Sequence, residues 1–226
     1  MKVAVLFSGG KDSCMALMKA MKFHEIECLI TIVSNNKESY MFHTPNIGIT
    51  KIQSKAIKIP VIQQRTKGEE EKELDDLKEA IKKAKQKFKI KGIVTGAIRS
   101  IYQAKRVQKI CKDLDLYCFN PLWLGNQIEL LEEILRNKFE VVISGVFAYP
   151  LDEKLLGKKI DDNVIALLKS LQEKYLINPA GEGGEIETTV LNAPFFNKKI
   201  KIIDYKKKYS KNSGVFQIKR AILIRK

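Results

Sequence analysis

The sequence predicts an α/β protein, in which a parallel sheet flanked by helices is followed by a smaller α+β unit. Two observations predict the first part: short apolar runs alternate with helical segments, and these runs lack the in–out alternation of a half-exposed sheet. A third observation predicts the second part. The chain changes character near Pro121, and its last segment, 199–226, alternates in places as antiparallel strands do. We therefore expect two domains, 1–120 and 121–226.

The strands and helices of the first domain are expected to alternate along the chain. Apolar runs predict strands at 3–7, 26–33, 61–64, 92–95 and 117–119. Helical patterns and turn signals predict helices at 14–23, 50–58, 69–88 and 101–114. In the first helix Met15, Met18 and Met21 are expected to face inward, with Ser13 as the N-cap. The second helix ends before Pro60, which disfavours a helical residue ahead of it.

The helix at 69–88 has the most regular pattern. Acidic residues crowd its start and lysines its end, as the helix dipole favours. Its apolar residues recur at helical spacing and predict one inward stripe: Leu74, Leu77, Ile81, Ala84 and Phe88. In the second domain we expect a helix at 128–137, a strand at 141–148, a helix at 163–175, and two or three antiparallel strands within 199–226.

The stretch 8–13, between the first strand and the first helix, reads Ser-Gly-Gly-Lys-Asp-Ser. Two adjacent glycines allow a sharp turn and a close approach to a ligand. The N–H groups of the helix start, the Lys11 ammonium and the hydroxyls of Ser8 and Ser13 would together favour a phosphate. Asp12 is out of place beside an anion unless it holds Mg²⁺, which accompanies triphosphates. The alternative is a turn that only joins strand to helix.

Two better-known phosphate motifs do not match this stretch. A P-loop needs Ser or Thr directly after its Gly-Lys pair, where this chain has Asp12. The dinucleotide-binding fingerprint needs one more glycine after Gly10, at a spacing that the chain lacks. The stretch 8–13 therefore predicts a phosphate site of another kind.

Composition places the chain among cytoplasmic globular proteins. A hydrophobic content of 45% in 226 residues supports a core, and no apolar run reaches membrane-spanning length. The N-terminus leads directly into a strand, so we expect no membrane association. Only two histidines are present, which argues against a histidine-rich metal site. The four cysteines form neither a C-x-x-C pair nor a zinc pattern and are expected as reduced core thiols: Cys14, Cys28, Cys111 and Cys118.

The formal net charge of +15 has two interpretations. One is a surface that meets nucleic acid or an acidic partner. The other is a lysine-rich composition of the kind found in heat-adapted proteins. Lysines occur throughout the sequence, and no recognised nucleic-acid motif accompanies them. We favour the compositional interpretation, which leaves nucleic acid as the less favoured partner.

Ligands of parallel sheets bind where strands end, near the point at which the strand order reverses. Besides the stretch 8–13, the segments 34–36 and 96–100 follow predicted strands. Ser34 and Gly96 are therefore expected beside the nucleotide, where Gly96 would allow close backbone approach. Arg99 would contact a phosphate. A helix start capped by Ser100 explains the last segment as well, and the two interpretations are compatible.

Acidic residues and glycines crowd the segment 178–188, which contrasts with the basic chain around it. A pocket for a cationic or amine substrate and a solvated turn before a strand are equally favoured here. Glu185 and Glu187 share one face if the strand has begun there. The segment 39–46 mixes aromatic, soft and polar side chains, which suits either a nucleobase or a core-packing loop. His43 within it is weak evidence for catalysis, since a lone histidine is more often structural.

With these segments considered together, the chain resembles the diphthine–ammonia ligase family of the N-type ATP pyrophosphatases. The stretch 8–13 matches the S-G-G-x-D-S loop of the whole superfamily. Three stretches are similar to the family itself: 31–46, 96–103 and 178–188, the last followed by Ala193-Pro194. Pro121-Leu122-Trp123 is also typical. The match covers nearly the full chain and departs at Ile186, where the family often has an aromatic residue.

The resemblance implies amidation of diphthine on translation elongation factor 2 by ammonia and ATP, through an acyl-adenylate. Diphthamide, AMP and pyrophosphate are the products. ATP and Mg²⁺ are the implied cofactors, bound to a first domain of the adenine nucleotide alpha hydrolase-like fold, and the second domain binds substrate. Lys11 would neutralise the leaving group and Asp12 would bind Mg²⁺. The implied pyrophosphate loop comprises Ser8, Gly9, Gly10, Lys11, Asp12 and Ser13.

The resemblance also implies sites for two cations, ammonium and the trimethylammonium group of diphthine. A carboxylate would take the proton of ammonium, and the candidates are Glu182, Glu185 and Glu187. Acidic residues with an aromatic ring, Tyr102 or Trp123, would hold the quaternary cation. His43 and Gln103 are further substrate-binding candidates. Free ammonia is the expected nitrogen source, since the sequence shows no glutaminase domain.

Two other functions stay open from the sequence. A tRNA-modifying ATP pyrophosphatase agrees with the basic charge, but thiolation enzymes need paired cysteines, and Cys111 and Cys118 are poorly spaced for that. A non-enzymatic adenine-nucleotide sensor on a similar fold would bind ATP without splitting it. A homo-oligomer is compatible with either function.

Overall fold

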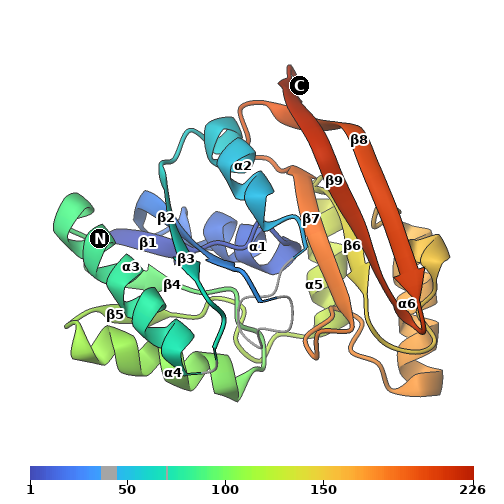
Figure 1. Cartoon of the computed structure of the whole chain (residues 1–226), viewed down its shortest axis with the longest axis horizontal. Coiled ribbons are helices and arrows are strands. Elements are labelled where there is room, and N and C mark those ends of the chain that lie inside the picture. Colours follow the sequence, from blue (N-terminus) through green and yellow to red (C-terminus); the bar gives the residue numbers. More distant parts are fainter. Residues whose placement is uncertain (37–44, 70) are drawn as a thin grey trace.

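The computed structural model describes residues 1–36, 45–69 and 71–226, and within them the chain forms two sheets surrounded by helices (Figure 1). The strands of the first sheet are β1 (Lys2–Leu6), β2 (Glu25–Ser34), β3 (Val61–Thr66), β4 (Gly92–Val94) and β5 (Tyr117–Phe119). All are parallel, in the order β3-β2-β1-β4-β5. The second sheet contains β6 (Glu140–Val146), β7 (Ile186–Asn192), β8 (Lys199–Ser210) and β9 (Ser213–Ile224), antiparallel in the order β7-β6-β9-β8. The predicted fold class is confirmed.

Helices cover both faces of the parallel sheet. The residues of α1 (Lys11–Ala20) and α2 (Thr50–Ile57) share one core with Val3 and Val5. The residues of α3 (Lys72–Phe88) and α4 (Ile101–Asp113) share the opposite core with Ala4. Because successive side chains of β1 point to opposite faces and both faces are covered, its sequence is apolar without alternation.

One hydrophobic core continues from the parallel sheet into the second sheet. It contains Val5 and Leu17 from the first part of the chain together with Leu131 and Val190 from the second. Leu131 lies on α5 (Gln127–Arg136), which packs with α6 (Asp162–Tyr175) beside the antiparallel sheet, as Figure 1 shows. Short 3-10 turns, η1 (Ile47–Ile49) and η2 (Glu153–Leu155), complete the described elements.

Helix α1 begins earlier than the sequence predicts. It starts at Lys11 rather than at residue 14, and Gly10 is its N-cap, without a side-chain cap. Ser13 is therefore inside the first turn, and its predicted role as N-cap is wrong. Met15 is buried as expected, but Met21 lies at the C-cap and is 37% exposed, so the prediction that it faces inward is also wrong.

The amphipathic pattern of α3 is confirmed. Leu77, Ile81 and Ala84 are buried, and Leu74 and Phe88 are partly buried against the same core. The helix starts at Lys72, three residues later than predicted, with Glu71 as its N-cap. The apolar residues of α3 and α4 thus face the sheet, since both helices contribute to the same core as Ala4 of β1.

The strand order places a topological switch point between β1 and β4. From β1 the chain continues to β2 and β3 on one side, and later to β4 and β5 on the other. The connections that leave β1 and β4 therefore run apart and leave room at the carboxyl ends of these strands. The stretch 8–13 and the segment 96–100 lie there, as predicted.

The cysteines are free, and Cys14, Cys28 and Cys111 are buried while Cys118 is half-buried. Although Cys111 and Cys118 are poorly spaced in sequence, the fold brings the end of α4 against β5. A thiol–thiol hydrogen bond with Cys118 raises the pKa of Cys111 and lowers that of Cys118. Among the described helices, none has both the length and the apolarity that a membrane span requires.

Candidate active site

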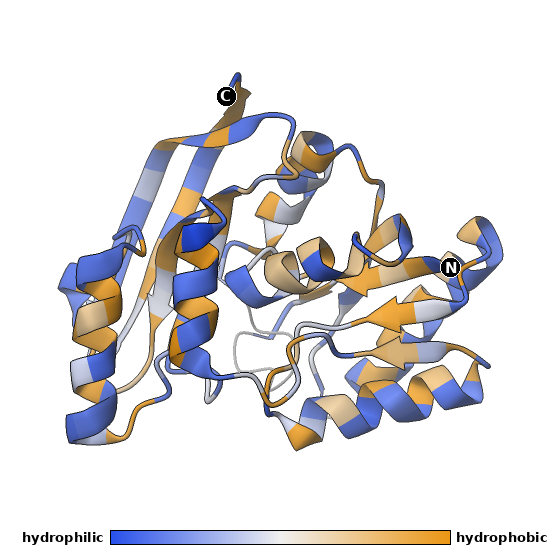
Figure 2. Ribbon diagram, turned by 180° about the vertical axis from the view of Figure 1, so that it is seen from behind, coloured by the Kyte–Doolittle hydropathy of each residue, from blue (hydrophilic) through white to orange (hydrophobic). Residues whose placement is uncertain are grey.

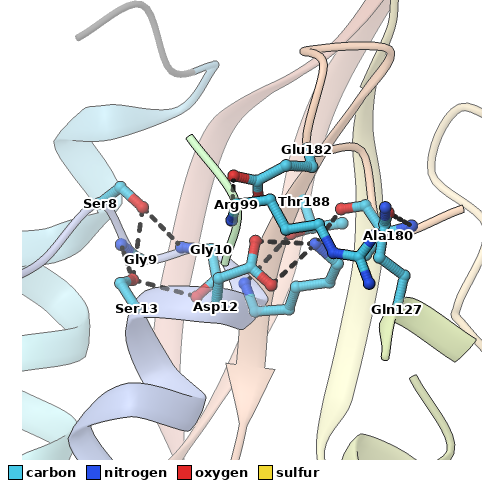
Figure 3. A network of polar contacts seen from close by, with 11 residues as sticks. Ser8, Gly9, Gly10, Asp12, Ser13, Arg99, Gln127, Ala180, Glu182 and Thr188 are labelled. Carbon is cyan, nitrogen blue, oxygen red and sulfur yellow. Dashed lines mark hydrogen bonds and ion pairs between the residues drawn. The ribbon is translucent and has the colours of Figure 1, made fainter. Parts of the chain in front are cut away.

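The stretch 8–13 forms a tight loop at the carboxyl end of β1 (Figure 3). Gly9 adopts a φ of +80°, and a Cβ atom at this position would lie 2.2 Å from Gln53 Oε1. Both the conformation and the space therefore require glycine. Gly10 adopts an ordinary extended conformation, but a Cβ there would lie 3.2 Å from the Thr188 carbonyl oxygen.

The two loop hydroxyls stabilise the loop itself. Ser13 Oγ accepts a hydrogen bond from the Gly9 N–H at 3.2 Å and donates one to the Gly10 carbonyl at 3.1 Å. Ser8 Oγ accepts from the Gly10 N–H at 3.4 Å and lies 3.3 Å from Ser13 Oγ. These contacts hold the loop in one shape at the positive end of the α1 dipole, where an anion is favoured.

Residues of strand β7 and helix α2 form hydrogen bonds with the backbone of this loop. Thr188 Oγ1 accepts a hydrogen bond from the Lys11 N–H at 3.1 Å, and the Val190 N–H donates to the Gly9 carbonyl at 3.0 Å. Gln53, which is fully buried in α2, donates through Nε2 to the carbonyls of Gly9 and Val190, at 2.9 and 2.8 Å. The second sheet thus forms one wall of the loop.

Lys11 and Asp12 form an ion pair at the start of α1. The Lys11 ammonium is buried and lies 3.0 and 2.8 Å from the two carboxylate oxygens of Asp12. It also donates to the carbonyl of Ala180, which belongs to the loop before β7. The Asp12 side chain is half-buried, so its carboxylate is accessible from the solvent side of the loop. The site therefore contains a buried cation and an accessible anion next to each other.

The three glutamates of the segment 178–188 have different surroundings. Glu182 Oε1 accepts hydrogen bonds from the N–H groups of Arg99 and Ser100, at 2.9 and 2.7 Å, just before α4. Burial raises the pKa of the Glu182 carboxyl, and these two hydrogen bonds act against that rise. Glu182 thus joins the acidic loop to the start of α4 (Figure 3).

Glu187 lies in β7, and Glu185 comes directly before the strand. Glu185 Oε1 accepts from the backbone N–H and the side-chain amide of Asn178, at 3.2 and 2.7 Å. Its other oxygen is buried and has no hydrogen-bond partner among the described residues. Burial raises the pKa of Glu187 to about 7, which the Lys11 charge opposes and the Asp12 charge reinforces. Glu187 therefore titrates near neutral pH within the electrostatic range of the loop pair.

Gln127, at the start of α5, orients the acidic loop. Its Oε1 accepts from the Ala180 N–H at 3.0 Å, and its Nε2 donates to Asn178 Oδ1 at 3.0 Å. A continuous chain of contacts therefore runs from Glu185 through Asn178, Gln127 and Ala180 to Lys11. Neither Gln53 nor Gln127 was predicted from the sequence, because an isolated glutamine in a helix carries no signal until its burial is known.

The structure places the other predicted nucleotide residues at the same edge of the parallel sheet. A Cβ on Gly96 would lie 2.9 Å from the Asp12 carbonyl carbon and the Ser13 nitrogen, so the close approach it allows is to the first turn of α1. Arg99 follows β4, and its side chain is exposed. Ser34 ends β2, where its hydroxyl bonds locally to the backbone of Asn36.

The predicted substrate residues are more dispersed. Tyr102 lies in the first turn of α4. The Arg106 guanidinium lies 3.4 Å from the centroid of its ring and so covers one of the two ring faces on which a quaternary cation could bind. The Gln103 N–H donates to Ser100 Oγ, which confirms Ser100 as the N-cap of α4. His43 and the rest of 37–44 lie outside the described residues. Their predicted roles stay predictions.

Trp123 lines a separate pocket of about 480 Å³ with Lys19 and Glu133, which are joined by a 2.8 Å ion pair. Lys19 lies eight residues along α1 from Lys11, which corresponds to about 12 Å of helix. The geometry therefore separates this pocket, and Trp123 with it, from the loop 8–13.

The comparisons with known families agree with this geometry. The family described as diphthamide synthase N-terminal domain matches residues 1–118, and the diphthamide synthase C-terminal domain matches residues 126–224.

The chain belongs to the diphthamide synthase family.

Relatives named diphthine–ammonia ligase support this assignment. The protein from Bos taurus is 37% identical over 224 residues, which are 90% of this chain and 83% of the relative. The protein from Homo sapiens is 36% identical with the same coverage. The Saccharomyces cerevisiae protein is 31% identical over 87% of this chain, but these residues are only 33% of its length. As a member of the diphthamide synthase family, the chain is an enzyme of the ligase class and uses a nucleotide.

Solved structures are more distant from this diphthamide synthase family member. A predicted subunit of tRNA methyltransferase from Methanocaldococcus jannaschii is 17% identical, with a TM-score of 0.42, over 86% of this chain and 98% of that chain. This similarity is too low to support an argument about function.

Proposed function

We propose that the chain catalyses the ATP-dependent amidation of diphthine on translation elongation factor 2, with free ammonia as the nitrogen source. In the first step the diphthine carboxylate attacks the α-phosphorus of ATP, and the bond to the β-phosphate oxygen breaks. Pyrophosphate leaves and an acyl-adenylate forms. In the second step ammonia attacks the acyl carbon, and AMP leaves to give diphthamide. Membership of the diphthamide synthase family, combined with the loop at the switch point, is the observation that carries this proposal.

The loop 8–13 supports the first step. Its backbone and the α1 dipole offer fixed positive partial charge, which stabilises the charge that accumulates on departing pyrophosphate. The buried Lys11 ammonium adds a full positive charge beside it. Asp12 is an accessible carboxylate, and one carboxylate with nucleotide phosphates and waters is a usual ligand set for Mg²⁺. When bound there, Mg²⁺ would neutralise phosphate charge, and the residue that would hold it is Asp12.

The glutamates support the second step. Ammonium must lose a proton before its nitrogen can attack, so a carboxylate near the acyl carbon is needed as a base. Glu187, whose pKa is raised to about 7, suits this role, because the best general base has a pKa near the working pH. Glu185 has a buried carboxylate oxygen without a partner among the described residues and suits the capture of ammonium. Glu182, which bonds the backbone before α4, would position the loop.

The decisive experiment supplies the purified chain with diphthine-bearing elongation factor 2, ammonium and Mg·ATP. Mass spectrometry of the factor should show conversion of the acid to the amide, and nucleotide analysis should show AMP. Omission of ammonium should leave the acid. Formation of ADP, or cleavage of ATP without amide, would contradict the proposal.

The same reaction mixture separates the two alternative functions. A nucleotide sensor would bind ATP and release no pyrophosphate. A tRNA-modifying enzyme would release pyrophosphate with tRNA and leave the elongation factor unchanged. We expect the reaction in the cytoplasm, where the proposed substrate takes part in translation.

A further inference from the structure

The C-terminal hairpin is the most basic part of the molecule. We call residues 199–226, which comprise β8, β9, the two-residue turn between them and the two residues after them, the basic hairpin. It contains ten Lys or Arg residues and a single acidic residue, Asp204, so it carries a formal charge of +9 out of the +15 of the whole chain. One eighth of the sequence thus holds more than half of the net charge, mainly because acidic residues are nearly absent from it.

The charges of the basic hairpin face solvent and are mixed with exposed apolar side chains. Lys206, Lys207 and Lys208 are consecutive and all exposed. Ile203 and Ile222 are 38% and 45% exposed, although isoleucine is usually buried. Figure 2 shows the two strands as mainly hydrophilic ribbons with separate apolar positions. A surface with both features fits a partner that offers negative charge and apolar contacts together.

The backbone of the basic hairpin is also open to a partner. In the described sheet β8 is the last strand, with β9 on its inner side. The neighbouring β6 pairs with β9 only at Val215 and Gly214, so most of the hairpin extends past the sheet as a two-stranded ribbon (Figure 1). An edge strand of twelve residues leaves a row of N–H and C=O groups for an added strand.

Asn46 connects the basic hairpin to the active site. Its side-chain amide donates to the Phe216 carbonyl at 2.9 Å and accepts from the Ile218 N–H at 2.7 Å, both on β9. The same amide nitrogen lies 3.5 Å from Thr189 Oγ1 on β7, next to the Thr188 hydroxyl that holds the loop 8–13. The hairpin is therefore linked, through Asn46, to the strand that also holds the loop 8–13.

From these observations we infer that the basic hairpin is the docking surface for an acidic, extended segment of the protein substrate. This inference rests on the proposed function, since it assigns the place where that substrate binds. Lysines supply attraction at a distance, the exposed isoleucines supply apolar contact, and β8 supplies backbone hydrogen bonds. Acidic side chains on the segment would pair with Lys206 and Lys208, which share a face of β8 because they are two residues apart.

RNA fits this surface less well than an acidic protein segment. Sequence-tolerant RNA binding depends on bases that stack on free aromatic rings. Tyr205 is the exposed aromatic residue of the hairpin, and its ring packs at 4.7 Å on Phe216. Lysines on an edge strand also prevent pairing between copies of a chain. Prevention of such pairing would explain the lysines, but it would not explain the exposed isoleucines beside the lysines.

The test reverses three charges on the basic hairpin, in the variant Lys206→Glu/Lys208→Glu/Arg220→Glu. The matched control reverses three exposed lysines on the helices of the parallel sheet, Lys82→Glu/Lys109→Glu/Lys112→Glu. At low salt we expect the hairpin variant to raise KM for the protein substrate roughly tenfold, with unchanged kcat and unchanged ATP affinity, because rim charges act mainly on encounter. The control should change KM less than twofold, and added salt should reduce the difference between the two.

The outcomes separate the inference from the proposed function. If the unmodified chain amidates the protein and the hairpin variant keeps its KM, the docking inference fails while the proposed function stands. The same holds if the hairpin variant loses binding to labelled RNA and keeps its KM. If the unmodified chain does not amidate the protein at all, the proposed function fails and the docking inference fails with it. A second variant, Ile203→Ser/Ile222→Ser, should raise KM at high salt as well, because apolar contacts are not screened.

Discussion

At the scale of single residues, Gly9 decides the shape of the loop 8–13. Its φ is +80°, and a Cβ atom added to it would lie 2.2 Å from Gln53 Oε1, which leaves no room for a side chain. A residue this constrained acts through the backbone, since its own N–H and carbonyl are held by Ser13, Gln53 and Val190.

Replacing Gly9 by Ala should weaken both the fold and nucleotide binding. We expect a loss of at least about 1–2 kcal/mol in the free energy of unfolding, from the left-handed conformation alone. Urea denaturation and titration with ATP measure the two effects. Gly48→Ala is the matched control, because a Cβ at Gly48 meets nothing within 4 Å. Equal ATP affinity in both variants would contradict the role of Gly9.

Glu187 is expected to make stability depend on pH. Its pKa rises from 4.5 to about 7 in the folded protein, mainly because burial disfavours the charged form. The folded state therefore binds more protons than the unfolded state between these values, and stability falls as pH rises from about 4.5 to 7. Below this window the carboxyl is neutral in both states, and above it the full penalty of the buried charge is present.

Glu187→Gln should remove this penalty and the reaction together. Since a pKa unit corresponds to about 1.4 kcal/mol, we expect the variant to be more stable than the unmodified chain by roughly 1–3 kcal/mol at pH 8, with no difference near pH 4. Denaturation midpoints at the two pH values test this. Amidation should fall at least about 100-fold, the usual contribution of a general base. A variant that is active and shows no pH-dependent gain would refute both assignments.

At the scale of elements, Gln53 couples α2 to the loop and to β7. It is fully buried, and its amide donates to carbonyls of both partners. Gln127, the first residue of α5, has a similar role, because its side chain forms hydrogen bonds with Ala180 and Asn178. Two glutamines from two helices thus hold the two loops, Gln53 the loop 8–13 and Gln127 the acidic loop, and Lys11 joins the loops through Ala180.

Gln53→Leu should leave two buried carbonyls with fewer partners. We expect a cost of about 1–3 kcal/mol in the free energy of unfolding and a lower affinity for ATP, because the loop loses its connection to α2 and keeps only its direct hydrogen bonds to β7. The exposed helical residue Gln108 provides the control, and Gln108→Leu should change neither quantity by much. Thermal unfolding with and without ATP compares them. Full ATP affinity in Gln53→Leu would show that the loop holds its shape without α2.

At the scale of the whole molecule, the two sheets share one core. Leu17 and Val5 lie in the same cluster as Leu131 and Val190, so separation of the sheets would expose apolar surface on both. The loop 8–13 lies at this junction, with the parallel sheet behind it and β7 against it. Site and core therefore depend on the same contacts.

We expect the chain to unfold in a single cooperative transition. Trp123 is the sole tryptophan of the sequence and lies after β5, where the two parts of the chain meet. Its fluorescence and the far-UV circular dichroism of the helices should therefore change at the same temperature. Two separate transitions would instead show that residues 1–120 and 121–226 fold independently. A fragment of residues 1–120 tests the same point, since it should expose the α1 face and aggregate.

The sequence was sufficient for the fold class because its signals are local. The buried strands, the amphipathic stripe of α3 and the Ser100 cap each depend on residues close together in the chain. The start of α1 could not be predicted in the same way. Ser13 has the chemistry of a cap, but the helix begins at Lys11, whose N–H is satisfied by Thr188, 177 residues away.

By itself, then, the sequence determined that a glycine-rich loop follows the first strand of a parallel sheet and that an acidic loop comes before a late strand. Only the tertiary structure decided that these loops meet, that Glu182, Glu185 and Glu187 have unlike surroundings, and that Gln53 and Gln127 hold them in place. It also placed the basic hairpin, whose charge is already concentrated in the sequence, at the edge of the second sheet. The physical reason is that burial, pKa and hydrogen-bond partners are properties of neighbours in space, which residue types and spacing along the chain do not specify.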